Sequence, residues 1–256
     1  MQPALFELHA ELEEKHWWFR GRRHIMLQLV HQVLPAGENA TVIDIGCGTG
    51  ANIAALAAQY RCIGIDQSEE GIQFARQRFA DVDFICASLP IELPPHCGPR
   101  LFLLMDVIEH IEDETFLSQV VDMMEADDHL LLTVPADMSL WSEHDVSFGH
   151  YRRYDIDQLQ AIWTNLPVEQ RLLSYFNTRL YPLVKLFRTL GRLRGGAWGA
   201  SGTDLKMPAP AVNNLLERFF GGEAKRLIAL LKNNDKRGYK RGVSLIALLR
   251  KTESQP

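Results

Sequence analysis

A glycine-rich turn directly after a buried strand is the feature that most restricts how this chain can fold. Residues 42–50 read Val-Ile-Asp-Ile-Gly-Cys-Gly-Thr-Gly, an apolar run that ends in Gly46, Gly48 and Gly50. Glycine tolerates left-handed backbone angles and lets the backbone approach a ligand closely. A strand, a tight turn and a helix in this order are typical of nucleotide-binding α/β folds, in which the ligand lies at the carboxyl end of the strand.

The segments that follow the turn alternate between short apolar runs and helical patterns. This alternation predicts a Rossmann-like, doubly wound α/β fold with a mostly parallel, seven-stranded sheet covered by helices on both faces. The expected strands are residues 41–45, 61–65, 82–86, 101–105, 129–134, 170–175 and 243–249. The expected helices between them are residues 50–59, 69–79, 114–126 and 155–164.

The length of the chain adds two helical parts to this core. The chain has 256 residues, and one α/β core needs roughly 150. We assign residues 1–40 to an N-terminal helical cap and residues 41–175 plus 242–251 to the core. Residues 176–241 are a helical insertion before the last strand, which we interpret as a lid or a docking surface. Within it we expect one basic amphipathic helix at 178–193, two more helices within 209–231 and a flexible joint at 195–203.

Two acidic residues near the turn indicate which nucleoside the chain binds. Asp66 ends the second expected strand, where it can accept hydrogen bonds from both hydroxyls of a ribose. The glycine turn alone also matches the loose dinucleotide pattern, so NAD is an alternative. Asp44 would repel a pyrophosphate, but it suits a cationic amino group or a sulfonium. S-adenosylmethionine carries both of these groups and is the cofactor that we infer.

These residues carry a resemblance to a known family. The sequence resembles the class I S-adenosylmethionine-dependent methyltransferases through Asp44-x-Gly46-x-Gly48-x-Gly50, through Asp66 and through the segment Asp106-Val107-Ile108-Glu109-His110. The segments 16–23 and 144–154 look like a bacterial subgroup linked to sugar and envelope biosynthesis. The resemblance implies an enzyme that transfers a methyl group from S-adenosylmethionine.

The resemblance also implies which residues contact the cofactor. Asp44 would face its amino group and Asp66 its ribose. Many relatives have an acid after the third strand that accepts the adenine amino group, whereas Cys86-Ala87-Ser88 has none. We therefore expect backbone groups, Ser88 or apolar packing to hold the adenine. The cofactor-binding residues that we expect are Asp44, Gly46, Cys47, Gly48, Gly50, Asp66, Gln67, Ala87, Ser88, Met105, Asp106 and Arg23.

Arg23 comes from an aromatic and basic segment of the cap. The run His16-Trp17-Trp18-Phe19 joins two helices that we expect within residues 4–34, and three arginines follow it. An arginine here could pair with the methionine carboxylate of the cofactor, and we assign that role to Arg23. The alternative is that the tryptophan pair packs the cap onto the sheet.

A second polar group follows the fourth expected strand. Asp106, Glu109 and His110 share one face if the chain turns helically there. One hypothesis is general base catalysis by His110 with Glu109 and His144. A second is a Mg²⁺ or Mn²⁺ ion held by Asp106, Glu109 and His110 with His144 or His150. A third is an ion-paired cap that only shapes the pocket.

Charge is unevenly distributed along the chain. The formal net charge is −5, yet residues 101–145 contain twelve acids and no Lys or Arg, so the rest of the chain carries +7. Bulk charge therefore does not favour nucleic acid as a partner. Residues 171–194 carry six positive charges and no acid. The helix at 178–194 could contact an anionic membrane surface or a lipid-linked substrate, and the alternative is a packed amphipathic helix.

The remaining expectations concern location and activity. The four cysteines form no CxxC pair, and the N-terminal segment lacks the basic-then-apolar order of a signal peptide, so we expect a cytoplasmic protein that could lie at the inner membrane face. The favoured function is O-methylation of a sugar-like or small polar acceptor, which could be lipid-linked. The alternatives are a metal-assisted RNA methyltransferase, an NAD-dependent oxidoreductase and a catalytically silent cofactor-binding module.

Overall fold

The computed structural model describes residues 10–37, 39–113, 115–194, 206–233 and 238–253. The segment 195–203, which we expected to be a flexible joint, lies outside these residues, as does the start of the first expected helix. In the described part of the chain, no helix has the length and apolar composition needed to cross a bilayer.

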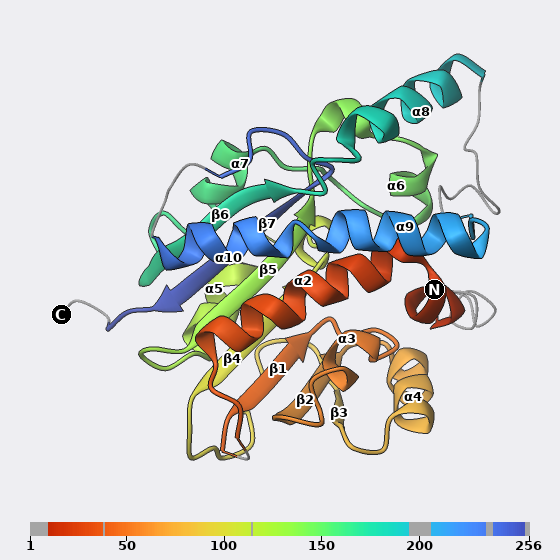
Figure 1. Ribbon diagram of the computed structural model, residues 1–256. Coiled ribbons are helices and arrows are strands. Elements are labelled where there is room, and N and C mark those ends of the chain that lie inside the picture. The colour runs from red at the N-terminus through yellow and green to blue at the C-terminus, as the bar shows by residue number, and fades with distance from the viewer. Residues whose placement is uncertain (1–9, 38, 114, 195–205, 234–237, 254–256) are drawn as a thin grey trace.

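A seven-stranded sheet with the order β3-β2-β1-β4-β5-β7-β6 forms the centre of the molecule (Figure 1). β1 to β5 pair in parallel, and β7 lies antiparallel between β5 and β6. This confirms the expected Rossmann-like fold. The strand order reverses between β1 and β4, and ligands of such sheets bind at that point. The strands are β1 (Thr41–Ile45), β2 (Arg61–Asp66), β3 (Asp83–Cys86), β4 (Arg100–Met105), β5 (His129–Pro135), β6 (Val168–Phe176) and β7 (Ser244–Lys251).

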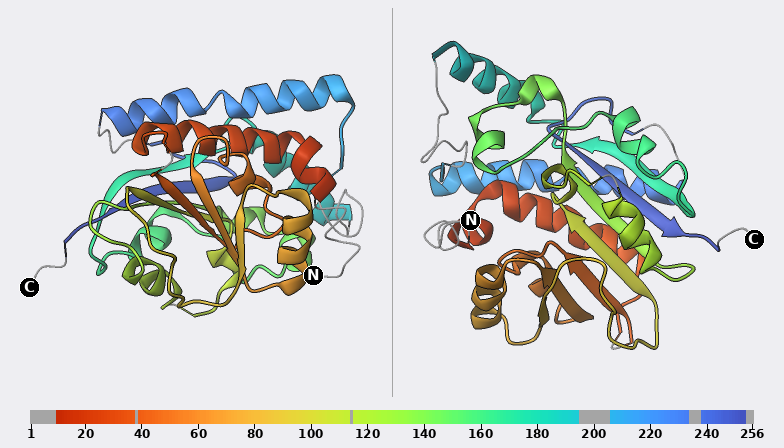
Figure 2. Two further views of the ribbon diagram at one scale, coloured as in Figure 1. Left: turned by 90° about the horizontal axis from the view of Figure 1, so that it is seen from below. Right: turned by 180° about the vertical axis from the view of Figure 1, so that it is seen from behind.

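Helices cover both faces of the sheet, as Figure 2 shows. Successive strand residues point to opposite faces, so Val42 belongs to one apolar cluster and Ile43 to the other. The first cluster includes residues of α2, α3, α4, α9 and α10, and the second includes residues of α5 and α7. The helices are α2 (Trp17–Val33), α3 (Ala51–Ala54), α4 (Glu69–Arg78), α5 (Phe116–Asp122), α7 (Ile156–Ala161), α8 (Tyr181–Arg194), α9 (Pro210–Gly221) and α10 (Ala224–Lys232).

Part of the segment 176–241, which the sequence predicts to be an insertion, lies in the same layer as α2. α9 and α10 run beside α2 across one face of the sheet (Figures 1 and 2). Phe220 of α9 is buried and packs edge-on against Trp17, with 6.0 Å between the ring centroids. A Cβ on Gly21 would lie 2.6 Å from the Phe220 ring, so a glycine in α2 lets the two helices approach closely. α9 and α10 therefore complete the core of the fold.

One expected helix is shorter in the structure. α3 spans only four residues rather than the expected 50–59, because the chain turns after it and buries Leu56 and Tyr60. The Tyr60 hydroxyl donates to the Leu34 carbonyl at 3.0 Å, which fixes that turn. The aromatic run at 16–19 lies where the two expected helices meet, because residues 10–15 are helical and α2 begins at Trp17. It forms the first turn of α2, and His16 caps that helix by accepting a hydrogen bond from the Trp18 N–H at 3.3 Å.

Candidate active site at the carboxyl edge of the sheet

The glycine turn after β1 forms the floor of the candidate site. Gly46, Gly48 and Gly50 have φ values of 76°, 54° and 85°, which side chains rarely allow. A Cβ at Gly46 would lie 2.6 Å from Val107, so this position also needs glycine for space. At Gly48 no atom of the described residues lies within 4 Å of a Cβ position. The backbone at Gly48 therefore faces open space, as the contact with a ligand requires.

Asp66 fixes the shape of this turn. Its carboxylate accepts hydrogen bonds from the Gly48 N–H at 2.9 Å and from the Ser68 N–H at 2.8 Å. Each carboxylate oxygen can accept a second hydrogen bond, so both oxygens can still bind ribose hydroxyls. Asp66 thus lies at the end of β2, where the sequence predicted it.

Asp44 lies inside β1 on the face that α2 covers. It is 1% exposed, and its Oδ1 atom has no hydrogen-bond partner among the described residues. Burial raises the pKa of the Asp44 carboxyl to about 8, although the nearby Arg22 opposes this shift. An unpaired, buried carboxylate oxygen is costly for the fold, so this atom calls for a cation or a hydrogen-bond donor.

Arg22 of α2 lies opposite Asp44. Its guanidinium donates to the Asp106 carboxylate and stacks on the Trp18 ring, 4.5 Å from the ring centroid. Burial lowers the pKa of Arg22 to about 10, and the nearby Glu13 opposes this shift. The Arg22 Nε atom is buried and has no hydrogen-bond partner in the described part of the chain. One unpaired acceptor and one unpaired donor therefore lie close to the glycine turn.

These two atoms fit the methionine part of S-adenosylmethionine. Its ammonium complements Asp44, and its carboxylate complements the Arg22 guanidinium. Arg23, the arginine that the sequence favours for the carboxylate, donates to the Glu13 carbonyl at 2.9 Å, and its Nε atom is also buried without a hydrogen-bond partner among the described residues. Its role therefore stays a prediction beside that of Arg22. Glu13 in turn accepts a hydrogen bond from the Thr49 hydroxyl, so the helical turn at 10–15 covers the glycine turn.

The other residues that the sequence predicts to bind the cofactor come from the glycine turn and from the ends of β3 and β4. Met105 is buried at the end of β4, and Cys47 is buried in the turn, where burial raises the pKa of its thiol and favours an unreactive packing role. The Ala87 N–H donates to the Asp66 carbonyl at 3.0 Å, so the segment after β3 lies beside Asp66, the residue predicted to bind the ribose. The Gln67 and Ser88 residues of that region are exposed.

Beyond Asp106 the chain forms the short 3₁₀ helix η1 (Ile108–His110). Glu109 is 0% exposed, and neither of its carboxylate oxygens has a hydrogen-bond partner among the residues described. Burial raises the pKa of Glu109 to about 8 and lowers the pKa of His110 to about 4. The His110 ring meets His150 edge to face, with 4.7 Å between the ring centroids. A buried acid and two imidazoles therefore lie together at this edge.

The segment after β5 holds His150 in place. It contains η2 (Met138–Leu140) and α6 (Glu143–Ser147), in which Asp145 is fully buried. Asp145 accepts from Arg153 Nε at 2.7 Å and lies 3.0 Å from His150 Nδ1. Burial opposes its ionisation, but hydrogen bonds from His150 and Arg153 outweigh burial and hold the pKa of Asp145 below its usual range. The Tyr151 N–H donates to the Glu109 carbonyl at 2.8 Å and joins this segment to η1.

The structure does not bring together the four metal ligands that we expected. Asp106 has a φ of 60°, so the chain turns before η1 and Asp106 does not share the face of Glu109 and His110. Its carboxylate binds Arg22 and accepts from the Thr133 hydroxyl at 3.0 Å. The potential ligand atoms of Glu109, His110 and His150 lie within 4.8 Å of one another. His144 is not in this group, and its ring centroid lies 6.4 Å from that of His150.

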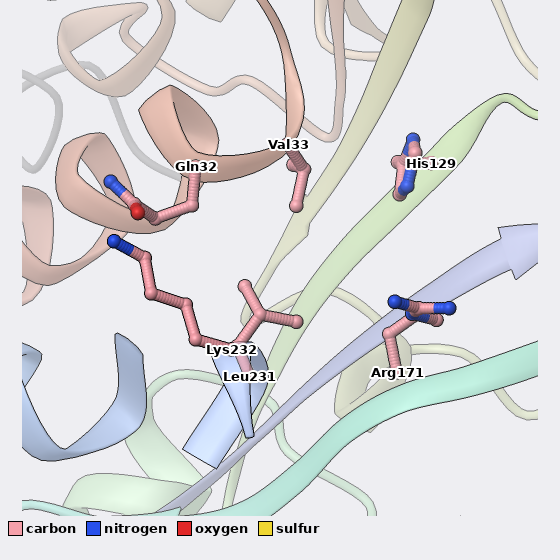
Figure 3. A pocket seen from close by; sticks show the side chains of 6 residues that line it. All are labelled: Gln32, Val33, His129, Arg171, Leu231 and Lys232. Carbon is pink, nitrogen blue, oxygen red and sulfur yellow. The ribbon is translucent and has the colours of Figure 1, made fainter. Parts of the chain in front are cut away.

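A different pocket lies at the opposite edge of the sheet. Figure 3 shows it between Gln32 and Lys232 on one side and His129 and Arg171 on the other. His129 is the first residue of β5, so this pocket lies at the amino edge of the parallel strands. It is therefore separate from the glycine turn, Asp44 and Glu109, which lie at or near the carboxyl edge.

Comparisons with known proteins agree with this geometry. Residues 42–127 match the family model described as "Methyltransferase domain". The chain is 28% identical over 172 residues to a protein of Mycobacterium tuberculosis named probable S-adenosylmethionine-dependent methyltransferase, and the match covers 62% of this chain and 60% of that protein. The chain thus spans less than two thirds of the length of this relative.

Solved structures show the same fold. A complex of the Haloferax volcanii Trm112 methyltransferase activator with a methyltransferase matches with a TM-score of 0.58 and 16% identity, over 99% of this chain and 96% of that one. The plantazolicin methyltransferase BpumL, in complex with a pentazolic desmethylPZN analog and SAH, matches with a TM-score of 0.55 and 12% identity, over 98% of this chain and 91% of that one. Residues 42–127 thus match a methyltransferase domain, and the whole chain has the fold of these solved structures.

Proposed function

We propose that this chain transfers the methyl group of S-adenosylmethionine to an oxygen, or less favourably a nitrogen, of a small polar or sugar-like acceptor. The cofactor part rests on one observation, the pair of buried and unpartnered atoms Asp44 Oδ1 and Arg22 Nε within the described residues. An α-amino acid group offers an ammonium and a carboxylate that complement these two atoms. NAD has no such group, so the pair favours S-adenosylmethionine.

Three fixed points would orient the cofactor. Asp66 would hold the ribose at the end of β2, while Asp44 and Arg22 would hold the methionine end below α2. The sulfonium between them would then face the edge where Glu109 and His110 follow β4. Holding the methyl donor and the acceptor in line contributes much of the rate of such a transfer, because it removes the entropic cost of bringing them together.

The acceptor would lie against Glu109, His110 and the segment that carries His144. During the transfer the C–S bond of the cofactor breaks, a C–O bond forms, and the cofactor leaves as a neutral sulfide. The hydroxyl proton of the acceptor must also leave. A neutral imidazole at His110 would accept this proton, and the polar side chains of Glu109, His110 and His150 suit a hydroxyl better than an apolar acceptor.

A methyl-transfer assay tests this proposal. Incubation with methyl-labelled S-adenosylmethionine and a panel of nucleotide sugars, lipid-linked sugars and short RNAs is expected to label a sugar class. Changing both Glu109→Ala and His110→Ala is expected to lower turnover about 100-fold and leave cofactor affinity unchanged. Glu112→Ala, an exposed acid of the same loop, is the control. Label in RNA alone would overturn the proposed acceptor, and unchanged turnover in the double variant would overturn the catalytic pair.

One helix favours an acceptor that is carried on an anionic lipid surface. α8 extends away from the sheet (Figures 1 and 2). Leu183 and Leu186 on α8 are 45% and 55% exposed, and residues 171–194 contain no acid. The base of the helix is fixed, because the Tyr181 hydroxyl donates to Asp137 at 2.5 Å. An exposed apolar stripe beside positive charge is typical of helices that lie in a membrane interface.

Sedimentation with vesicles tests the lipid part. The chain is expected to sediment with vesicles that contain phosphatidylserine and to remain in solution with neutral vesicles or at high salt. Leu186→Asp is expected to abolish sedimentation, because it places a charge in the apolar stripe. Leu215→Asp, at a leucine of α9 that is 67% exposed, is the matched control. Equal sedimentation with neutral vesicles, or no effect of Leu186→Asp, would contradict this assignment.

A further inference from the structure

Glu109 is a buried acid whose carboxylate receives no hydrogen bond from the described residues. It is 0% exposed, and both carboxylate oxygens lack a hydrogen-bond partner among the described residues. The two nearby arginines are engaged with other acids, since Arg22 binds Asp106 and Arg153 binds Asp145. A buried polar group without a partner is costly and calls for a group that the chain does not supply.

Two imidazoles lie beside this carboxylate. His110 follows Glu109 directly in η1, and His150 comes from the segment after β5. The potential ligand atoms of the three residues all lie within 4.8 Å of one another. In a metal site with bonds of about 2.1 Å, ligand atoms lie about 3–4.2 Å apart. Small rotations of the side chains would therefore close these three residues around an ion.

A buried carboxylate fixes the second nitrogen of His150. His150 Nδ1 lies 3.0 Å from the buried Asp145 carboxylate, so Nε2 is the nitrogen of His150 that remains available to an ion. The backbone of Phe148 and Gly149 lies close enough to the His110 ring to oppose the effect of burial on its pKa. Metal-binding histidines usually donate their second nitrogen to a carboxylate or a backbone carbonyl in this way, because that contact fixes the ring and its tautomer.

We propose that Glu109, His110 and His150 bind a divalent transition-metal ion, such as Zn²⁺ or Mn²⁺. Two imidazole nitrogens and one carboxylate form a donor set that suits these ions. Mg²⁺ prefers oxygen ligands and retains several waters, so the donor set disfavours it. Three protein ligands leave coordination positions open for water or an acceptor hydroxyl.

The site would have a direct use in the proposed reaction. A metal-bound hydroxyl loses its proton more readily, so an acceptor oxygen that binds there would become a better nucleophile. This use rests on the proposed methyl transfer, whereas the binding of the ion does not. If the acceptor hydroxyl binds the ion, His110 and Glu109 act as metal ligands. The hydroxyl proton then leaves to water rather than to His110.

Metal binding can be measured without any activity assay. The purified chain is treated with a chelator, equilibrated with Zn²⁺, Mn²⁺ or Mg²⁺, and passed through a desalting column for elemental analysis. About one Zn²⁺ or Mn²⁺ per chain is expected, with Mg²⁺ near zero. Saturating Zn²⁺ is also expected to raise Tm by about 5 °C, because the ion binds only the folded state. Co²⁺ in the same site is expected to give visible absorption bands.

Single substitutions locate the ion. Glu109→Gln and His150→Asn are each expected to lower metal affinity at least about 10-fold and to abolish the Tm shift. Glu112→Gln and His24→Asn, which change exposed residues, are the matched controls. Glu109→Gln is isosteric and removes a buried charge, so the variant is expected to fold. Substoichiometric Zn²⁺ and Mn²⁺ in the wild-type chain, or wild-type affinity in both variants, would overturn the site. Metal binding without methyl transfer would contradict only the proposed function.

Discussion

Replacing Asp44 by Asn is expected to weaken S-adenosylmethionine binding about 100-fold. Asp44 Oδ1 is buried and has no partner in the described part of the chain, so the ammonium of the cofactor would form a charge pair with little competition from water. Removing one partner of such a pair costs about 3 kcal/mol, which corresponds to about 100-fold in affinity. Calorimetric titration of the two chains with S-adenosylmethionine measures the difference.

The same variant is expected to be more stable than the wild-type chain at alkaline pH. The pKa of Asp44 is raised from its ordinary 3.8 to about 8, mainly by burial, and the charged groups that face it are Arg22, Asp66 and Glu13. Between these two values the folded chain holds a proton that the unfolded chain releases. The stability that Asp44 contributes therefore falls as the pH rises from about 4 to about 8.

Asn does not titrate, so the Tm advantage of Asp44→Asn is expected to be larger at pH 8 than at pH 5. Asp83→Asn, at an exposed acid of β3, is the control for both measurements and is expected to change neither. A variant that binds the cofactor as tightly as the wild-type chain would remove Asp44 from the site. A Tm difference that is equal at the two pH values would show that Asp44 is ionised in the fold.

Asp145→Ala is expected to cause the largest loss of stability. Asp145 is 0% exposed and is the carboxylate that binds both Arg153 and His150. Its removal would leave the Arg153 guanidinium buried beside a cavity, which costs about 3–5 kcal/mol. For a chain of this length the loss corresponds to a fall in Tm of about 10 °C.

Differential scanning calorimetry of the Asp145→Ala chain measures this fall. Asp122→Ala, at an exposed acid in α5, is the control and is expected to change stability by less than about 0.5 kcal/mol. A Tm within about 2 °C of the wild-type value would show that Asp145 does not hold the segment after β5. Asp145→Ala also removes the carboxylate that contacts His150 Nδ1, so the metal-binding measurements described above can be made on this variant as well.

Much of the fold could be predicted because its central strands β1, β4, β5 and β7 are buried on both faces. Such strands appear in the sequence as short apolar runs, and all seven expected strands occur within two residues of their predicted bounds. The predicted helix at 50–59 is wrong in length. Alanines favour a helix locally, but the burial of Leu56 and Tyr60 requires a turn. Packing of one segment against distant ones is not visible in a local pattern.

Prediction of the residues near the glycine turn was limited in the same way, because some of them depend on packing between distant segments. Asp44 and Asp66 could be predicted because they lie on strands whose carboxyl ends meet at one edge. Arg22 and Arg23 are adjacent on a helix, so their side chains point about 100° apart. Which of them faces the sheet depends on how α2 packs against Phe220, and that contact joins segments about 200 residues apart in the chain.

The grouping of Glu109, His110 and His150 could not be predicted, because it depends on contacts that leave no pattern in the sequence. Asp106, Glu109 and His110 have helical spacing, but the φ of 60° at Asp106 removes it from the shared face. His150 joins Glu109 and His110 because the Tyr151 N–H donates to the Glu109 carbonyl. Both histidines of the segment after β5 were candidates, and only the docking of that segment selects between them.

The central claim is that Asp44 and Arg22 bind the methionine part of S-adenosylmethionine. Side-by-side calorimetric titration of the wild-type chain with S-adenosylmethionine and NAD tests it most directly. The expected result is binding of one S-adenosylmethionine per chain, loss of about 100-fold in affinity in Asp44→Asn, and no measurable binding of NAD. Tight binding of NAD, or binding of S-adenosylmethionine that Asp44→Asn leaves unchanged, would contradict the claim.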